Sequence, residues 1–141
     1  MLLILRMVQK LRRVQGLENK MQRGIRGAIT VDNNSVEDVK IATIELISEM
    51  KNRNNYKEED ISYVLFTMTD DIDCAYPAKF AREEFREWQY VPMMCTQELK
   101  VVGSLEKCLR ILLVVNTDLA QNEIKHVYLK GAEKLRKDLS K

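Results

Sequence analysis

The sequence is poor in the residues that bind metal ions or crosslink chains. It contains one histidine, His126, and three cysteines, Cys74, Cys95 and Cys108, with no CxxC pair. A zinc site needs cysteines and histidines clustered at ligand spacing, so we expect no metal centre. An odd, widely spaced set of cysteines is typical of reduced thiols in a cytosolic protein, and we therefore expect a cytoplasmic location.

Long hydrophobic runs and a broad basic surface are also missing. The most apolar N-terminal stretch, residues 2–5, ends at Arg6, which is too short for a membrane span or a signal-peptide core. The formal charge is +2, but residues 1–20 hold five basic residues and one acidic residue, so the remaining 121 residues carry a charge of −2. We therefore expect neither a membrane nor a nucleic-acid partner. With 141 residues, 45% of them hydrophobic and only two prolines, the chain fits one globular domain.

Residues 1–20 have the pattern of an appendage. Leu2, Leu5, Val8 and Leu11 recur at helical spacing among basic residues, which is typical of a membrane-surface or targeting arm. The alternative is an unstructured extension that precedes the true start at Met21. We favour the extension because a transit peptide is usually rich in serine and this stretch has none. The sequence thus predicts a basic extension over 1–20, disordered or from a misassigned start, and a domain over 21–141.

The rest of the chain alternates short strands and helices. Strands are expected at 25–31, 61–68, 109–116 and 126–129, and extended segments at 90–95 and 99–102. Asn34 or Ser35 starts a helix that runs to about residue 51, and Pro77 starts another that runs to about Arg86. A short helical turn is expected at 104–107, and another after 129. Strands outnumber helices, which predicts an α+β fold with a mixed sheet and helices on one face.

Three charged residues lie where burial is expected. Arg110 interrupts the strongest apolar strand, Arg26 lies inside the glycine-flanked first strand, and Glu98 ends an extended run. A buried charge is costly unless it is paired or faces a bound ion, so each residue alone fits a strand edge or a structural ion pair. Together, two arginines and a carboxylate also fit a receptor for a small dicarboxylate, because the guanidinium fork matches carboxylates. Cys95 and His126 as a thiol–imidazole pair are a weaker alternative, since a lone cysteine in an apolar run more often packs.

An ordered set of motifs covers the chain from about Met21 to Ser140. These motifs are RGIRGA at 23–28, YPAK at 76–79 with Arg82, WQYVP at 88–92, Cys95 with Gln97 and Glu98, Cys108 with Arg110, Thr117-Asp118, HVYL at 126–129 and Leu135-Arg136. Each motif is weak alone, but the whole ordered set resembles the AroH-class monofunctional chorismate mutases. Residues 1–20 lie outside the resemblance.

The resemblance implies a homotrimer of pseudo α/β-barrel type, with active sites in the clefts between subunits. Arg26 would hold a substrate carboxylate, Glu98 the ring hydroxyl, and Arg110, helped by Tyr128, the ether oxygen and a carboxylate. The further substrate-binding residues implied are Met94, Cys95, Thr96, Gln97, Tyr76, Ala78, Lys79, Arg82, Leu135 and Arg136. Met94 stands where the family has threonine, and Tyr76 where it has phenylalanine.

The implied activity is the isomerisation of chorismate to prephenate, in the shikimate-pathway branch to phenylalanine and tyrosine. This rearrangement is unimolecular and pericyclic, so it needs no cofactor, nucleophile or acid–base pair. Positioning and preorganised electrostatics are the means available to the enzyme. The alternative is a non-catalytic trimeric protein that binds a small carboxylate on the same scaffold.

Overall fold

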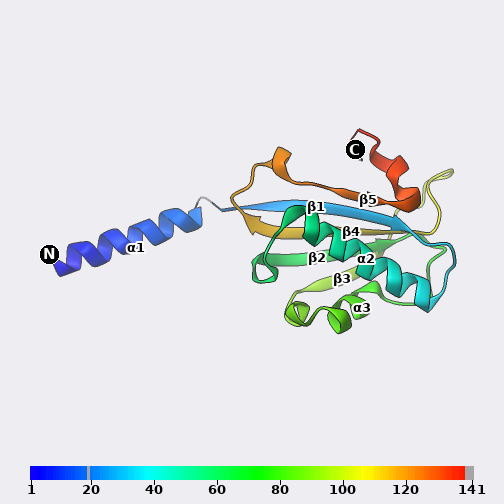
Figure 1. The fold of residues 1–141 in the computed structure, drawn as a ribbon, viewed down its shortest axis with the longest axis horizontal. Coiled ribbons are helices and arrows are strands. Elements are labelled where there is room, and N and C mark those ends of the chain that lie inside the picture. Colours follow the sequence, from blue (N-terminus) through cyan, green and yellow to red (C-terminus); the bar gives the residue numbers. More distant parts are fainter. Residues whose placement is uncertain (19, 139–141) are drawn as a thin grey trace.

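A single mixed sheet organises the residues that the computed structural model describes, which are 1–18 and 20–138. Its strands are β1 (Met21–Thr30), β2 (Ile61–Met68), β3 (Met93–Gln97), β4 (Cys108–Thr117) and β5 (Val127–Leu129). They lie in the order β3-β2-β4-β1-β5 (Figure 1). The central strand β4 is antiparallel to both β1 and β2, whereas the edge strands β3 and β5 are parallel to their neighbours. The predicted mixed sheet is confirmed.

Two helices cover one face of this sheet, as expected. Helix α2 (Val36–Asn54) starts at Ser35, whose side chain accepts a hydrogen bond from the Asp38 N–H at 3.2 Å. Helix α3 (Pro77–Glu84) has proline in its first turn. Single 3₁₀ turns lie at Glu58–Asp60, Arg86–Trp88 and Gln121–Glu123, and a longer 3₁₀ segment at Lys130–Arg136 follows β5.

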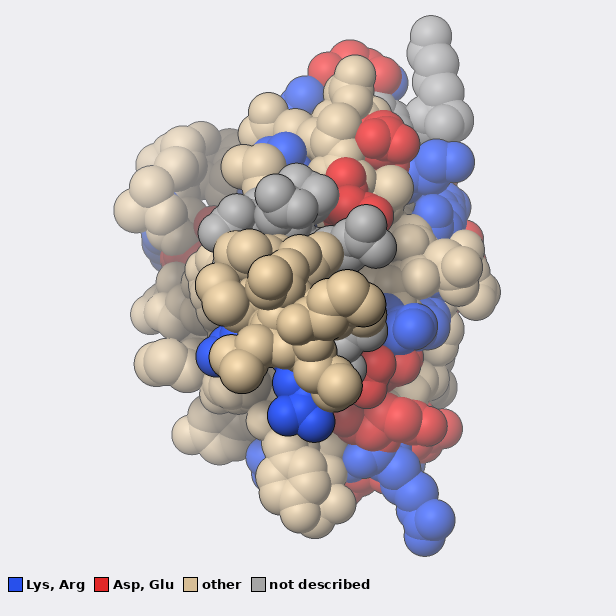
Figure 2. Space-filling view, turned by 90° about the vertical axis from the view of Figure 1, so that its left-hand side faces the viewer, with Lys and Arg blue, Asp and Glu red and all other residues tan. Residues whose placement is uncertain are grey.

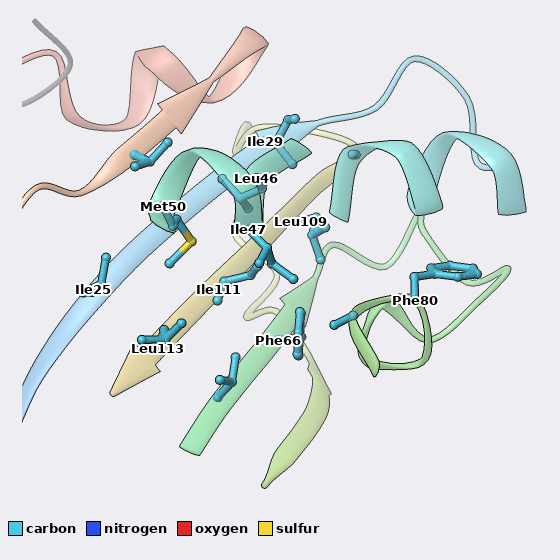
Figure 3. Close-up of a cluster of buried hydrophobic side chains, with 14 of the residues drawn as sticks. Ile25, Ile29, Leu46, Ile47, Met50, Phe66, Phe80, Leu109, Ile111 and Leu113 are labelled. Carbon is cyan, nitrogen blue, oxygen red and sulfur yellow. The ribbon is translucent and has the colours of Figure 1, made fainter. Parts of the chain in front are cut away.

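The core lies between these helices and the sheet. Leu46, Ile47 and Met50 of α2 pack against alternate residues of β1, β2 and β4, among them Ile25 and Phe66 (Figure 3). A side chain on Gly27 would collide with Met50 and Leu46, so glycine lets α2 approach β1 closely. This packing fixes which face of every strand looks toward the helices.

The loop between β3 and β4 differs from the sequence-based expectation. Residues 99–102 form no strand, and the side chains of Leu99 and Val102 are 80% and 99% exposed. Residues 104–107 form no helical turn, because Lys107 has a positive φ of 47° and its N–H donates to Asp71. The apolar residues suggested an extended segment, but none of the described strands pairs with them.

Residues Leu2–Glu18 form helix α1, which projects away from the sheet (Figure 1). Leu2, Leu3 and Ile4 are 66–78% exposed. Figure 2 views the end from which α1 projects and shows an uncharged cluster with basic side chains beside it. None of the described helices is long and apolar enough to cross a membrane. The domain boundary at residue 20 stays a prediction.

Candidate active site

The sheet face opposite the helices carries a row of aligned residues, one from each strand. Backbone pairing sets Tyr128 of β5 beside Ala28 of β1, Ala28 beside Arg110 of β4, Arg110 beside Thr67 of β2, and Thr67 beside Thr96 of β3. Paired residues on neighbouring strands project to the same side of a sheet. Two of the predicted catalytic residues, Arg110 and Tyr128, therefore belong to one row.

Glu98 joins this row from the end of β3. Its N–H donates to the Met68 carbonyl at 2.8 Å, which continues the β2–β3 pairing by one residue. Its Oε2 lies 3.3 Å from Arg110 Nε and also accepts a hydrogen bond from the Thr67 hydroxyl. The Arg110 and Glu98 side chains are 28% and 23% exposed, so this ion pair is open to solvent on one side.

The row also contains buried hydrogen-bond donors without partners in the described residues. Arg110 Nε is close to Glu98, but the geometry of a hydrogen bond is not met, and the Tyr128 hydroxyl has no partner either. Buried polar groups in folded proteins are nearly always satisfied. Three such atoms occur in the described residues, and two of them lie on this row, which makes the row the candidate for binding a polar ligand.

The start of β4 is held by a network that precedes Arg110. The Cys108 N–H donates to Thr69 Oγ1, and the Lys107 N–H donates to Asp71 Oδ2, both at 2.9 Å. Thr69 in turn donates its hydroxyl to Asp71. Because these bonds tie β4 to the end of β2, the backbone two residues before Arg110 is fixed.

Arg26 lies on the same face, on β1. Its N–H donates to His126 Nδ1 at 2.9 Å, while its guanidinium makes no hydrogen bond or ion pair within the described residues. Burial, together with the nearby charges of Arg26 and Arg136, lowers the pKa of His126. A neutral imidazole with Nδ1 as acceptor fits this environment, and it leaves the Arg26 charge available for a ligand.

The predicted rim residues lie at opposite edges of the sheet. Ala78, Lys79 and Arg82 belong to α3, which Tyr76 precedes and which packs beside β3, whereas Leu135 and Arg136 follow β5. Four strand spacings separate β3 from β5, a distance of about 19 Å. A single chain therefore does not bring all of these residues around one small ligand.

The remaining predicted residues of β3 divide between the two faces. Met94 and Thr96 alternate with Cys95, which packs against the core on the helix side, and Gln97 ends the strand. Burial raises the pKa of the Cys95 thiol. His126 adjoins β5 at the far edge, so Cys95 and His126 do not form a thiol–imidazole pair.

Among the hollows lined by described residues, one borders the row through Glu98. The loop 99–106 and Glu98 line a cavity of about 390 Å³, and a shallower one of about 750 Å³ reaches Leu135. A hollow of about 560 Å³ around Lys20 and Tyr56 contains none of the predicted site residues. The charge arrangement therefore identifies the site better than cavity size does.

The sequence analysis did not single out Thr67, and it named His126 without its contact to the Arg26 backbone. Thr67 resembles an ordinary strand-forming residue in an apolar run, and its contact with Glu98 spans 31 residues. Strand alternation offered one signal, because Thr67 falls on the same side as Tyr63 and opposite the core residue Phe66.

Comparisons with known proteins agree with this geometry. Residues 22–139 match the family described as chorismate mutase type I. The chain belongs to this family. It is 43% identical over 120 residues to the chorismate mutase AroH of Bacillus subtilis, covering 85% of this chain and 94% of that protein. It is 42% identical over 120 residues to the AroH enzyme of Thermus thermophilus, covering 84% and 97% respectively.

A solved structure shows the same fold. The chorismate mutase of Clostridium thermocellum superposes with a TM-score of 0.75 at 44% identity, covering 79% of this chain and 97% of that one. The resemblance noted from the ordered motifs is thus confirmed, as is the chorismate mutase fold of the subunit. The protein is accordingly an enzyme of the chorismate mutase class.

The contact between His126 and Arg26 predicts a low imidazole pKa in this chorismate mutase. A protonated Nδ1 cannot accept the Arg26 N–H, so the fold favours the neutral ring and loses stability as the pH falls below about 6.5. Because His126 is the single histidine, its ring resonances can be followed by NMR without assignment. We expect the pH midpoint of the His126 titration in the folded protein to lie below the midpoint in the urea-unfolded chain. His126→Asn, which offers an amide oxygen to the same N–H, is the control and should remove this part of the pH dependence. A midpoint at or above the unfolded value would contradict the assignment.

Proposed function

We propose that the protein converts chorismate to prephenate at the Arg110 row, in the branch that leads to phenylalanine and tyrosine. The observation that carries this proposal is the pair of unsatisfied buried donors, Arg110 Nε and the Tyr128 hydroxyl, on one row beside Glu98. The reaction breaks one C–O bond as it forms one C–C bond, and no proton or electron enters or leaves. The side chains therefore need only to fold the substrate and stabilise its developing charge.

Each charged side chain has a role that suits its surroundings. Arg26, whose guanidinium has no partner within the described chain, binds a substrate carboxylate. Glu98 accepts a hydrogen bond from the ring hydroxyl. Arg110 donates to the ether oxygen, where negative charge grows in the transition state, and Tyr128 assists it.

We further propose a homotrimer with sites completed between subunits. On the sheet face that carries Arg110, two residues further along each strand, lies an apolar row of Leu112, Leu65 and Met94. Met94 is 71% exposed. An apolar sheet face normally packs against another element. The 3₁₀ segment Lys130–Arg136 covers the β1–β5 end of this face through Ala132, but neither hydrophobic cluster of the described residues includes Leu112, Leu65 or Met94. A neighbouring copy would cover this apolar row and bring α3 of one subunit toward β5 of another, which unites the separated rim residues Tyr76, Ala78, Lys79, Arg82, Leu135 and Arg136.

Chorismate and prephenate are then the only small-molecule partners that the mechanism requires, and it uses no cofactor. The three cysteines are free thiols, which supports a cytoplasmic location.

Substitutions of Arg110 test its catalytic role. Removing one preorganised donor from a desolvated site costs about 3–4 kcal/mol, or roughly 10²–10³ in rate. Arg110→Ala should lower kcat by at least that factor, because a full charge is lost together with the hydrogen bonds. Arg110→Lys keeps the charge without the planar fork and should restore only part of the activity.

Circular dichroism and sedimentation provide the control for these Arg110 variants, and both should match the parent protein. If Arg110→Ala unfolds the chain while Arg110→Lys is fully active, Arg110 belongs to a structural ion pair and the catalytic role is wrong.

The shared-site proposal predicts that activity depends on assembly. Leu112→Asp, which places a charge in the apolar row, should dissociate the trimer and lower turnover per subunit, because half of each site is lost. Lys40→Asp, on the exposed surface of α2, is the matched control and should leave both unchanged. Analytical ultracentrifugation measures the trimer content, and turnover per subunit is measured at the same protein concentrations. A dissociated, fully active Leu112→Asp monomer would rule out shared sites.

A further inference from the structure

We propose that Thr67 is a positioning residue that holds one oxygen of Glu98 and so keeps this carboxylate from pairing with Arg110 through both of its oxygens. The inference rests on the proposed function, because it assigns Arg110 to the ether oxygen and Glu98 to the ring hydroxyl. Thr67 itself contacts neither the ether oxygen nor the ring hydroxyl of the substrate in this arrangement. It acts through Glu98.

The two oxygens of Glu98 have different surroundings. Oε2 accepts the Thr67 hydroxyl and lies 3.3 Å from Arg110 Nε. Oε1 makes no hydrogen bond or ion pair with any described residue. Thr67 therefore determines that Oε2 is the oxygen that contacts protein groups, and it leaves Oε1 as the acceptor for a substrate hydroxyl.

Glu98 and Arg110 have a competing arrangement available. A carboxylate and a guanidinium prefer to pair through two parallel hydrogen bonds. In that arrangement both Glu98 oxygens would bind Arg110 and would occupy the N–H groups that the ether oxygen needs. The single contact through Oε2 keeps Glu98 off the other N–H groups of the guanidinium, which also contacts the Cys108 thiol.

Thr67 is well placed to enforce the single contact. Its strand is paired on both sides, with Arg110 of β4 and Thr96 of β3 as its direct neighbours. Its branched side chain has few χ1 rotamers. The hydroxyl is therefore fixed before substrate binds, in the way that supporting groups orient charged site residues elsewhere.

Thr67→Val tests the hydroxyl while keeping the shape of the side chain. A hydrogen bond to a charged group is worth a factor of roughly 10 to 100, so kcat/KM should fall by about that much. The fall should include a lower kcat, because Glu98 then occupies Arg110 N–H groups that the ether oxygen needs in the transition state. Thr67→Ser keeps the donor and should stay within about threefold of the parent. Ser62→Ala, which removes a hydrogen-bonded hydroxyl from the same strand, is the matched control and should have little effect.

A double-mutant cycle with Glu98→Ala shows whether Thr67 acts through Glu98. In the Glu98→Ala background, Thr67→Val should cost less than about threefold, because the carboxylate that it orients is gone. Thr67→Ala also lacks the donor and should lose the same factor as Thr67→Val, which keeps the test valid if valine disturbs packing. Thermal unfolding should show that every variant remains folded.

The outcomes separate the two proposals. If Thr67→Val and Thr67→Ala retain full kcat while Glu98→Ala is strongly impaired, the positioning role is wrong and the proposed function stands. A loss from Thr67→Val that is equally large in the Glu98→Ala background also overturns the inference. If neither Glu98→Ala nor Thr67→Val changes kcat/KM, the role of Glu98 in the proposed function fails as well.

Discussion

Strand alternation in β4 is the constraint on which the site depends. β4 pairs with β1 over its whole length and with β2 from Leu109 to Val115, so its register around Arg110 is fixed from both sides. Leu109, Ile111 and Leu113 point toward the helices and are fully or nearly fully buried. Arg110 must therefore point to the other face, which α2 and α3 do not cover. The same alternation that builds the core also places a permanent charge at the centre of the sheet.

The energetic cost of placing the Arg110 charge there is small because Glu98 pairs with it and both side chains stay partly exposed to solvent. For a fully buried ion pair, the free energy of hydration that is lost exceeds the Coulombic attraction that is gained unless every hydrogen bond is satisfied. Arg110 and Glu98 keep a quarter of their surface in solvent, and Thr67 adds a donor to the carboxylate. Arg110 Nε makes no hydrogen bond with a described residue, so the ion pair does not use all of the donors of Arg110. The arrangement costs little in the free enzyme and leaves a donor for the growing negative charge of a transition state.

The elements that could be predicted from the sequence are those with local signals. The apolar run at 61–68 is β2 with the same limits, and Ser35 and Pro77 begin helices where capping chemistry placed them. Residues 99–102 were predicted wrongly as extended, because apolar residues alone do not show whether a pairing strand is available. Periodicity identified Arg110 as unusual, and the family resemblance supplied its role. The contact between Thr67 and Glu98 required three-dimensional pairing across β2 and β3, which no local pattern contains.

Turnover of chorismate by the purified wild-type protein tests the central claim most directly. The cyclohexadiene absorbance of chorismate should disappear, and prephenate should accumulate in equal amount, with saturation in chorismate and no added cofactor. Thorough chelation should not change the rate, because the proposed mechanism routes no step through a metal. Absence of prephenate from correctly folded, trimeric protein would contradict the assignment of the Arg110 row as a chorismate mutase site.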